Sequence, residues 1–501
     1  MPWGHYRQMW LRPSNHTKAV RVNLMTAAKL HFSPAKLPLA PTVRKNTLTS
    51  VQLIYWCAAN ATRRAMLGRV GLAQIHFNHV LVAGPTTHAM SAWTHPSDGQ
   101  GAGYSSWEYW QHLARVAERG CFDGVFFADV LSVGGHNYEF ESVRFGGVPR
   151  YDPFSVVAGM AAATTHLGFA ATLTTSGTPP FIAARRVSTL DNLTGGRMAW
   201  NVVTGYLEAD FKALGMDRPE HDDRYDQADE YIEICKRLWD GFPASAIVRD
   251  AAQGIYLDMD QIKKVQFEGK YYKCETYPVI EQSPQGRPLI FQAGASPRGL
   301  RYAVRHADAI FALQPRVAMA DCVSTVKSAA SAEKQRSPKV FLGIQPIIAD
   351  TEELALSYVR ELEATVPIEP AVSRLAGLLG VDFKLEDLDK PVDRLGTEGS
   401  QGGVASVMNW SGDGSPTLRE MVQHFGTSPM TPRLVGPPER VAAEIEAIWR
   451  ETGCYGFTIS PHTNPSSIET FVDEVVPILQ AKGLMRTEYA GYTYRENLEQ
   501  N

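Results

Sequence analysis

The feature that most constrains the fold is a regular alternation between short apolar runs and segments with helical periodicity. Most of the apolar runs are continuous, which is typical of strands buried on both faces of a parallel sheet. Eight strand–helix units of this kind predict an α/β fold, specifically a (β/α)₈ TIM barrel. The predicted strands are residues 75–81, 122–129, 167–174, 197–204, 288–292, 309–313, 340–348 and 456–460.

Capping residues mark where several of the helices begin. Ser, Thr and Asp side chains accept hydrogen bonds from the first free N–H groups of a helix, so they favour the position just before it. Asp152 precedes Pro153, Ser296 precedes Pro297, and Thr351 precedes Glu352. We therefore expect helices to start directly after these three residues.

The spacing of the units also predicts how the chain is organised. The barrel is expected over residues 72–485, with long insertions near 130–152, 240–286 and 365–436. Loops of this length in a compact domain are usually functional or disordered. Residues 486–501 are assigned as a C-terminal tail.

The first 71 residues form a basic extension ahead of the barrel. Residues 1–97 contain 11 Lys or Arg and no Asp or Glu, whereas the rest of the chain has 38 basic and 53 acidic residues. Three interpretations of residues 1–71 remain open: a poorly ordered extension, an organelle-targeting segment, and a mis-predicted start for which Met66 is an alternative.

Composition indicates which partners and which cellular compartment to expect for this protein. No run of 18 apolar residues occurs, so no membrane-spanning helix is expected. The six cysteines are scattered without a C-x-x-C pair, which favours free thiols in a reducing, cytoplasmic setting. The basic residues of the extension are sparse and unclustered, so no nucleic-acid partner is expected.

Polar side chains stand at the ends of three predicted strands, where barrel enzymes place their active sites. Asp129 ends the second strand, Thr172 lies near the end of the third, and Asn201 lies near the end of the fourth. Each has an ordinary structural explanation as well. An Asp is common in turns, and a buried Thr or Asn can satisfy backbone groups.

Two helix starts add further candidates. His221 and Tyr225 are four residues apart, so they share one face of the helix that follows the fourth strand. Ser296 opens the helix after the fifth strand, and free N–H groups at such a terminus favour a phosphate. Simple helix capping or packing explains these residues equally well.

Several cofactor and catalytic motifs are absent. There is no G-x-G-x-x-G after a strand, no P-loop, no H-E-x-x-H and no G-x-S-x-G. His88 and His95 follow the first strand, but no third metal ligand is evident beside them, so no metal is assigned. The catalytic residues themselves remain unknown at this level.

Taken together, five segments resemble the flavin-dependent monooxygenases of the bacterial luciferase-like superfamily. The resemblance covers residues 72 to about 485. It is greatest to the branch of nitrilotriacetate monooxygenase component A, dibenzothiophene sulfone monooxygenase and long-chain alkane monooxygenase. The segments are Phe126-Phe127-Ala128-Asp129-Val130, residues 188–197 (STLDNLTGGR), Trp200-Asn201-Val202-Val203-Thr204, His221-Asp222-Asp223-Arg224-Tyr225-Asp226, and Gln292-Ala293-Gly294-Ala295-Ser296.

The resemblance implies an FMNH2-dependent monooxygenase, the oxygenase component of a two-component system. A separate NAD(P)H:flavin reductase would deliver FMNH2, and one atom of O2 would enter a small organic substrate through a C4a-peroxyflavin. A homo-oligomer is also expected. Residue by residue, the family's flavin contacts fall on Asp129, Thr172, His221, Tyr225 and Ser296, with Asn201 as a further candidate.

Departures from the family keep the substrate open. In the alkane enzyme a His follows the fourth-strand motif and a Cys stands near the end of the first strand, whereas this chain has Gly205-Tyr206 and Gly84 there. Alkane oxidation is therefore not expected. Three alternatives remain: a deazaflavin- or flavin-dependent oxidoreductase acting by hydride transfer, a non-catalytic flavin-binding protein, and a metal-dependent barrel hydrolase.

Overall fold

The computed structural model describes most of the chain that follows the basic extension. The extension assigned to residues 1–71 lies outside the described residues, as do parts of the first and third insertions. The described residues are 74–90, 92–132, 143–293, 296–379, 383–392, 416–428 and 431–500.

Eight parallel strands form a closed ring. Each strand pairs with the next around the ring, and β13 returns to pair with β1. The predicted (β/α)₈ barrel is thereby confirmed, and each strand lies within or overlaps its predicted range. The ring strands are β1 (His76–Leu81), β2 (Gly124–Phe127), β3 (Gly168–Thr174), β4 (Met198–Val203), β9 (Leu289–Gln292), β10 (Ala309–Ala312), β11 (Lys339–Ile348) and β13 (Gly456–Ile459).

One strand beside the ring was not predicted. β12 (Arg433–Gly436) pairs in parallel with the second half of β11, starting with Gln345 opposite Arg433. The first half of β11 pairs with β10 and β13 instead. Because β12 is short and only alternate residues of it are buried, its sequence lacks the continuous apolar run that marks the ring strands.

Helices surround the ring, and the predicted caps are in place. The side chains of Asp152, Ser296 and Thr351 each accept a hydrogen bond from a backbone N–H in the first turn of the following helix. The helices are α3 (Trp107–Arg119), α5 (Pro153–Ala161), α6 (Pro180–Leu193), α8 (His221–Asp240), α9 (Pro297–His306), α10 (Met319–Ala332), α11 (Glu352–Ala364), α15 (Pro438–Thr452), and the run α16 (Ser466–Thr470), η8 (Phe471–Val475) and α17 (Val476–Ala481).

The C-terminal segment closes the barrel at the end where the strands begin. Tyr494, the first residue of α18 (Tyr494–Glu499), is fully buried and its hydroxyl donates to Asn78 Oδ1 at 2.9 Å. A Cβ on Gly168 would lie 2.3 Å from the Tyr494 ring, so only glycine leaves room for this contact. The segment assigned as a tail therefore supplies part of the barrel's interior packing.

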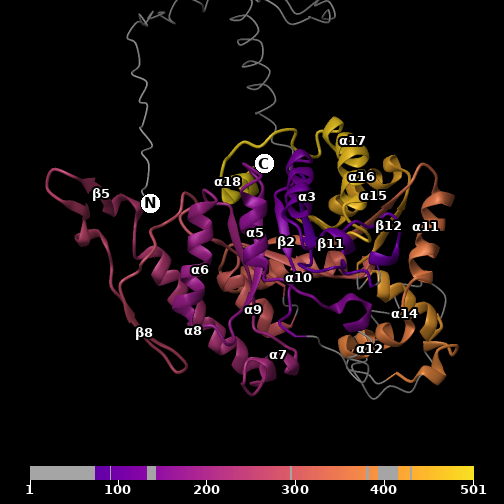
Figure 1. The fold of residues 1–501 in the computed structure, drawn as a ribbon, viewed down its shortest axis with the longest axis horizontal. Helices are drawn as coiled ribbons and strands as arrows, with labels where there is room; N and C mark the ends of the chain where they lie inside the picture. The colour runs from indigo at the N-terminus through magenta and orange to yellow at the C-terminus, as the bar shows by residue number, and fades with distance from the viewer. Residues whose placement is uncertain are drawn as a thin grey trace, which may run out of the picture. The chain divides into compact units, whose positions relative to one another are not determined.

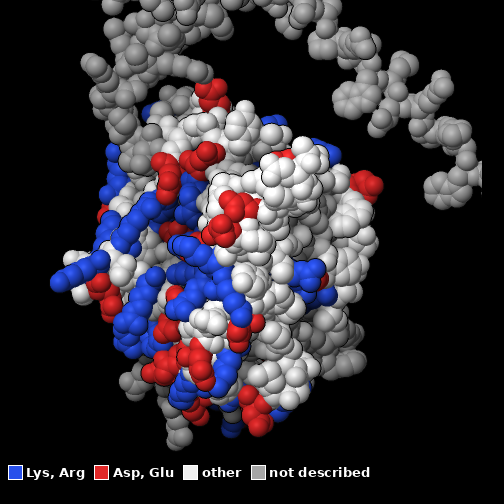
Figure 2. All heavy atoms as spheres, turned by 90° about the vertical axis from the view of Figure 1, so that its left-hand side faces the viewer, with Lys and Arg blue, Asp and Glu red and all other residues white. Residues whose placement is uncertain are grey.

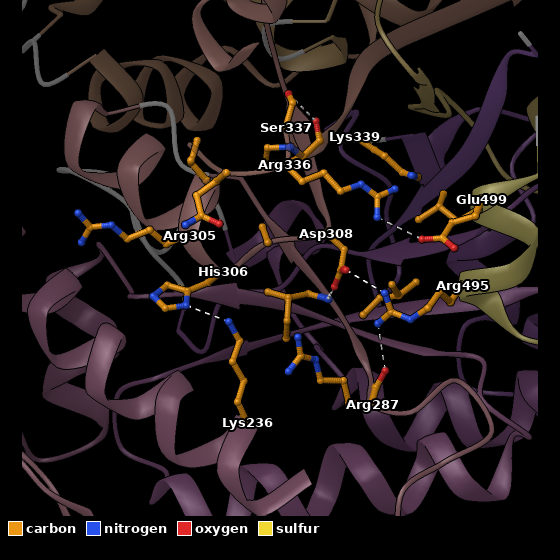
Figure 3. Close-up of a pocket in the computed structure, with 17 residues that line it drawn as sticks. Lys236, Arg287, Arg305, His306, Asp308, Arg336, Ser337, Lys339, Arg495 and Glu499 are labelled. Carbon is orange, nitrogen blue, oxygen red and sulfur yellow. Dashed lines mark hydrogen bonds and ion pairs between the residues drawn. The ribbon is translucent and has the colours of Figure 1, made fainter. Parts of the chain in front are cut away.

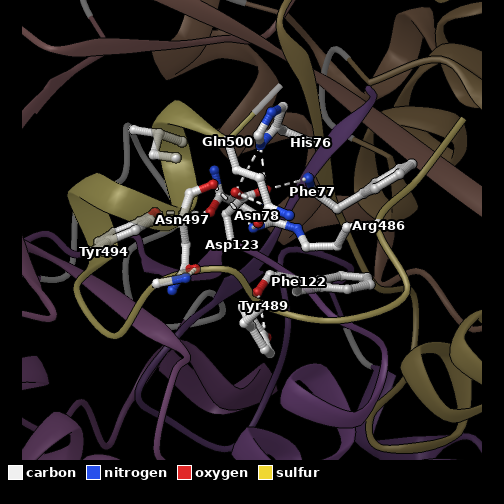
Figure 4. Close-up of polar contacts among 12 residues, drawn as sticks. His76, Phe77, Asn78, Phe122, Asp123, Arg486, Tyr489, Tyr494, Asn497 and Gln500 are labelled. Carbon is white, nitrogen blue, oxygen red and sulfur yellow. Dashed lines mark hydrogen bonds and ion pairs between the residues drawn. The ribbon is translucent and has the colours of Figure 1, made fainter. Parts of the chain in front are cut away.

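A buried ion pair anchors the same segment (Figure 4). The guanidinium of Arg486 contacts the Asp123 carboxylate, whose other oxygen accepts from the backbone N–H of Phe77 at 2.8 Å. His76 Nδ1 lies 2.7 Å from Asp123 Oδ1. Burial disfavours the charged carboxylate, but Arg486 and His76 outweigh it and lower the pKa of Asp123.

The second insertion contains two antiparallel hairpins beside α8. They are β5 (Ile247–Asp250) with β6 (Ile255–Leu257), and β7 (Val265–Glu268) with β8 (Lys273–Thr276). Basic and acidic side chains intermingle on this face of the molecule (Figure 2). Ion pairs such as Lys264–Glu275 at 2.6 Å account for part of this mixture.

The third insertion contributes α12 (Ile368–Leu379) and α14 (Leu418–Thr427), which pack around their own apolar cluster. Met90, from the loop after β1, belongs to this cluster, and its N–H donates to Gly426 O at 2.6 Å. Figure 1 shows α12, α14 and α7 (Glu208–Ala213) at the end of the barrel opposite α18. These helices therefore stand near the carboxyl ends of the ring strands.

Among the described residues, no helix combines the length and the hydropathy that crossing a bilayer requires.

Candidate functional site

Thr172 and Asn201 meet inside the barrel where β3 and β4 approach their carboxyl ends. The two residues are direct neighbours in the strand register, and Asn201 Nδ2 donates to Thr172 Oγ1 at 2.8 Å. Thr172 Oγ1 in turn donates to Phe127 O at 2.6 Å. Asn201 Oδ1 is buried and has no hydrogen-bond partner among the described residues. The pair therefore presents one free acceptor to the barrel mouth.

Tyr225 and Ser296 form a second group, between α8 and the start of α9. A Cβ on Gly299 would lie 2.6 Å from the Tyr225 hydroxyl and 3.0 Å from Ser296 Oγ, so the missing side chain lets the two hydroxyls converge on the helix terminus. Ser296 Oγ already accepts from Gly299 N at 3.0 Å. Its proton, the Tyr225 proton and the helix dipole all favour an anion here.

His221 shares the helix face of Tyr225, as the spacing predicts, and their ring centroids are 5.2 Å apart. The His221 side chain is 47% exposed, and its Nδ1 lies 2.7 Å from Asp222 Oδ1. Tyr225 is buried, and burial raises its pKa, while hydrogen bonds with Ser296 and Thr204 oppose that shift. Tyr225 is therefore a neutral donor at physiological pH, beside an imidazole that solvent reaches.

Asp129 lies directly after β2 at the same end of the ring. Burial raises the pKa of its carboxyl to about 7, although Arg150 and the N–H of Val130 favour the charged form. A carboxyl with this pKa exchanges a proton near neutrality, which is the range a general acid or base needs. No contact that joins Asp129 directly to the other two groups is present among the described residues.

Sequence reasoning missed several partners of Tyr225. Gln292, at the end of β9, points its amide at the Tyr225 hydroxyl at 3.5 Å, and Gln292 Oε1 is buried without a partner among the described residues. The Arg298 guanidinium lies 5.5 Å from the centre of the Tyr225 ring. Arg298 also pairs with Asp226 at 2.8 Å and Asp229 at 2.6 Å, which fixes α8 against α9. The only sequence signal for these contacts is the clustering of polar residues around the two helix starts.

A separate hollow of about 170 Å³ lies at the opposite end of the ring, where β9, β10 and β11 begin (Figure 3). Its lining is rich in basic side chains, but several of them are paired. Arg495 contacts Asp308 at 3.0 Å, and Arg336 contacts Glu499 at 3.3 Å. Catalytic sites of such barrels lie at the other end of the strands, so the barrel mouth is the better candidate site.

The described part of the chain contains no group of three or more His, Cys, Asp or Glu side chains arranged to hold a metal ion. His88 and His95 accordingly gain no third ligand among those residues.

The fold and the mouth define a class: a (β/α)₈ barrel with the hydroxyls of Tyr225 and Ser296 beside a helix N-terminus. Comparison with known proteins makes the class more specific. The family model for luciferase-like monooxygenase matches residues 86–456. The chain belongs to this family of flavin-dependent monooxygenases, whose members include FMNH2-dependent enzymes.

Individual relatives agree with this assignment. The chain is 35% identical to the dimethyl-sulfide monooxygenase of Hyphomicrobium sulfonivorans, over 81% of this chain and 86% of the relative. It is 32% identical to nitrilotriacetate monooxygenase component A of Aminobacter aminovorans, over 81% of this chain and 92% of the relative. The crystal structure of DmoA from Hyphomicrobium sulfonivorans superposes with a TM-score of 0.80 at 32% identity, covering 85% of this chain and 92% of that one.

Proposed function

We propose that this chain is the oxygenase component of a two-component monooxygenase. It would take FMNH2 from a separate NAD(P)H:flavin reductase and transfer one atom of O2 to a small organic substrate. The observation that carries the proposal is that a luciferase-like barrel holds two polar groups toward the carboxyl ends of its strands, Tyr225 with Ser296 and Thr172 with Asn201. A homo-oligomer remains a prediction.

The mouth fits FMN on two grounds. A phosphate needs donors, and the hydroxyls of Ser296 and Tyr225 supply them at the start of α9, where the helix dipole also favours an anion. A flavin ring and its ribityl chain carry N–H and O–H donors, and the buried Asn201 Oδ1 offers them an acceptor that no described residue occupies. In this proposal Ser296 and Tyr225 hold the phosphate, Asn201 and Thr172 face the ring or the ribityl chain, and His221 forms part of the pocket wall.

Reduced flavin supplies the electrons that activate O2. The protein's tasks are then to orient the ring, to exclude water and to manage a proton. Asp129 suits the last task, because burial raises its pKa to about 7 and it can hold or release a proton at the mouth. The absence of a dinucleotide-binding motif fits a chain that receives its flavin already reduced.

The test begins with the full chain and no reductase. Under oxygen-free conditions the protein is titrated with FMNH2, and binding is followed by flavin fluorescence. Isotope-labelled O2 is then admitted with a panel of thioethers, sulfones and amines, and products are analysed by mass spectrometry. One labelled oxygen atom per product molecule is the expected result.

Three results would overturn the proposal in different ways. If FMNH2 does not bind, the chain is not a flavin enzyme of this kind. If FMNH2 or a deazaflavin reduces the substrate with no consumption of O2, the chain is a hydride-transfer oxidoreductase. A flavin that binds but never reacts productively with any substrate and O2 would favour a non-catalytic flavin-binding protein.

A further inference from the structure

The hollow at the base of the barrel carries more positive than negative charge. Its volume is about 170 Å³, far above the roughly 10–15 Å³ that one water molecule requires, so it admits a group of several atoms. Two carboxylates line this base hollow, those of Asp308 and Glu499. The cationic side chains that line it are Lys236, Arg287, Arg305, Arg336, Lys339 and Arg495.

Both lining carboxylates are already engaged, as Figure 3 shows. Asp308 Oδ1 lies 3.0 Å from Arg495 Nη1, and Asp308 Oδ2 accepts from the backbone N–H of Ile290 at 2.9 Å. Glu499 Oε1 accepts from Arg336 Nη1 at 3.3 Å. The other lining cations therefore have no carboxylate partner within the base hollow itself.

Lys236 is held at the base hollow by an uncharged partner. An ammonium can only donate, so Lys236 Nζ donates to His306 Nδ1, which lies 3.0 Å away. The ring proton then lies on His306 Nε2, which donates to Asp229 Oδ1 at 2.8 Å. Burial lowers the pKa of His306, in agreement with this neutral form. His306 therefore orients Lys236 without neutralising it, and no carboxylate of the described residues lies within ion-pair distance of Lys236 Nζ.

Arg287 adds a second positive charge beside Lys236. Figure 3 shows both side chains extending into the same part of the base hollow. Arg287 contacts Asp240 at 3.2 Å, but the two side chains are 39% and 55% exposed, and an exposed pair of this kind is weak. Burial and the charge of Arg287 lower the pKa of Lys236. A cation that is partly removed from water beside another cation normally has an anion next to it.

Lys339, at the start of β11, is a second lysine of this kind. Its Nζ lies 4.7 Å from the centre of the Tyr455 ring, and no carboxylate of the described residues stands within ion-pair distance of it. Burial, together with Arg336, lowers the pKa of Lys339. The base hollow thus has an excess of more than one positive charge.

We propose that the base hollow binds an oxyanion of the phosphate type, held by the Lys236 ammonium and the Arg287 guanidinium. A guanidinium can donate two parallel hydrogen bonds to such a group, and an ammonium adds a compact charge. A phosphate group carries about 1.5 to 2 negative charges near neutrality, so it matches this excess of positive charge better than a carboxylate does. The site lies where the ring strands begin, so it is distinct from the barrel mouth and does not rest on the proposed function.

The test measures the binding of inorganic phosphate to the full chain by calorimetry, with no flavin present. Sodium chloride holds the ionic strength constant, so that screening of charges does not change during the titration. The unaltered protein is expected to bind phosphate. Lys236→Gln and Arg287→Gln should each bind it about tenfold or more weakly, because each loses a hydrogen bond to a charged group. Lys236→Arg keeps the charge and should retain part of the affinity.

A matched control removes the same charge elsewhere. Lys264 is exposed beside β7, and Lys264→Gln should leave phosphate affinity intact. Thermal unfolding without phosphate checks that each variant folds, and the more exposed Arg287 decides the test if Lys236→Gln is unstable. The proposal is overturned if the unaltered protein binds no phosphate, or if either folded variant of the base hollow retains full affinity.

A second arm separates the base hollow from the barrel mouth, where Ser296 also favours a phosphate. Ser296→Ala should bind inorganic phosphate as the unaltered protein does. A loss of binding in Ser296→Ala but not in Lys236→Gln would place the phosphate at the mouth and overturn the proposal.

Phenyl phosphate then distinguishes the two sources of the oxyanion. If it binds as tightly as inorganic phosphate and depends on Lys236 in the same way, the base hollow accepts the phosphate group of an organic ester. If it binds much more weakly, the ligand is the free ion. Both results support an oxyanion site, and neither measurement requires flavin or O2.

Discussion

At the scale of single residues, the Tyr225 hydroxyl is the contact whose removal is most informative. It is buried, lies near Ser296 and is approached by the Gln292 amide. We expect Tyr225→Phe to weaken FMN binding by about 1–3 kcal/mol, the cost of leaving a buried acceptor without its donor. Fluorescence titration of FMN measures the change directly.

The neighbouring tyrosine provides a matched control. Tyr302 packs 5.7 Å from Tyr225, ring centre to ring centre, and its buried hydroxyl has no partner among the described residues. Tyr302→Phe should therefore leave FMN affinity unchanged. Equal affinities in the two variants would remove Tyr225 from the flavin site.

Asp129 makes stability depend on pH in a direction that the structure fixes. Its folded pKa of about 7 lies above the value of about 4 expected for an unfolded chain. The folded protein therefore keeps a proton that the unfolded chain releases, and stability falls as pH rises through that window. Asp129→Asn removes this loss of stability. Its free energy of unfolding should therefore rise relative to that of the unaltered protein by on the order of 1 kcal/mol between about pH 5 and pH 8, measured by thermal unfolding.

The comparison needs a substitution that changes the same charge elsewhere. Asp321→Asn, at an exposed position on α10, serves as that control. A constant difference between Asp129→Asn and the unaltered protein at every pH would contradict the raised pKa.

At the scale of elements, the C-terminal segment holds the base of the barrel through Arg486. Both members of the Arg486–Asp123 pair are almost fully buried. Arg486→Leu should lower the free energy of unfolding by about 3–5 kcal/mol, because it leaves the Asp123 carboxylate buried without its partner. Urea denaturation at fixed protein concentration measures the loss.

Two further variants isolate the cause. Adding Asp123→Asn to Arg486→Leu removes the unpaired charge and should restore part of the stability. Arg450→Leu breaks the exposed pair with Glu446 and should cost less than about 1 kcal/mol.

Because the folded pKa of Asp123 is lowered, the contribution of the Arg486–Asp123 pair to stability is present above about pH 4 and disappears as pH falls through the folded pKa. An equal cost at neutral and strongly acidic pH would contradict this account.

An element could be predicted from the sequence where its pattern lies within one short stretch of the chain. Ring strands such as β3 are buried on both faces, so their apolar runs are continuous and could be recognised. The role of α18 depends on Tyr494 fitting over Gly168, a contact between distant parts of the chain that no periodicity reveals. β12 was missed because a short strand with alternate burial gives a weak pattern.

The candidate site likewise combines contacts that the sequence predicts with contacts that it does not. The spacing of His221 and Tyr225 on one helix face predicts their proximity, and adjacent parallel strands predict that of Thr172 and Asn201. The approach of the Gln292 amide to the Tyr225 hydroxyl joins β9 to α8, two elements that are far apart in the sequence. Sequence patterns carry no information on such contacts, which is why the substrate could not be read from the sequence.

At the scale of the whole molecule, the family match leaves the basic extension outside it. The family match begins at residue 86, and 85% of this chain accounts for 92% of the solved relative. Little of the relative is therefore left over to correspond to the extension.

A chain that starts at Met66 should consequently fold and bind FMN as the full chain does. All ring strands, the Tyr225–Ser296 group and the Arg486 anchor lie beyond that point. We expect the same thermal midpoint and the same FMN affinity for both lengths, measured by scanning calorimetry and fluorescence titration. Because the shorter chain loses ten basic residues but no described contact, a lower midpoint would show that the extension contributes to the barrel's stability.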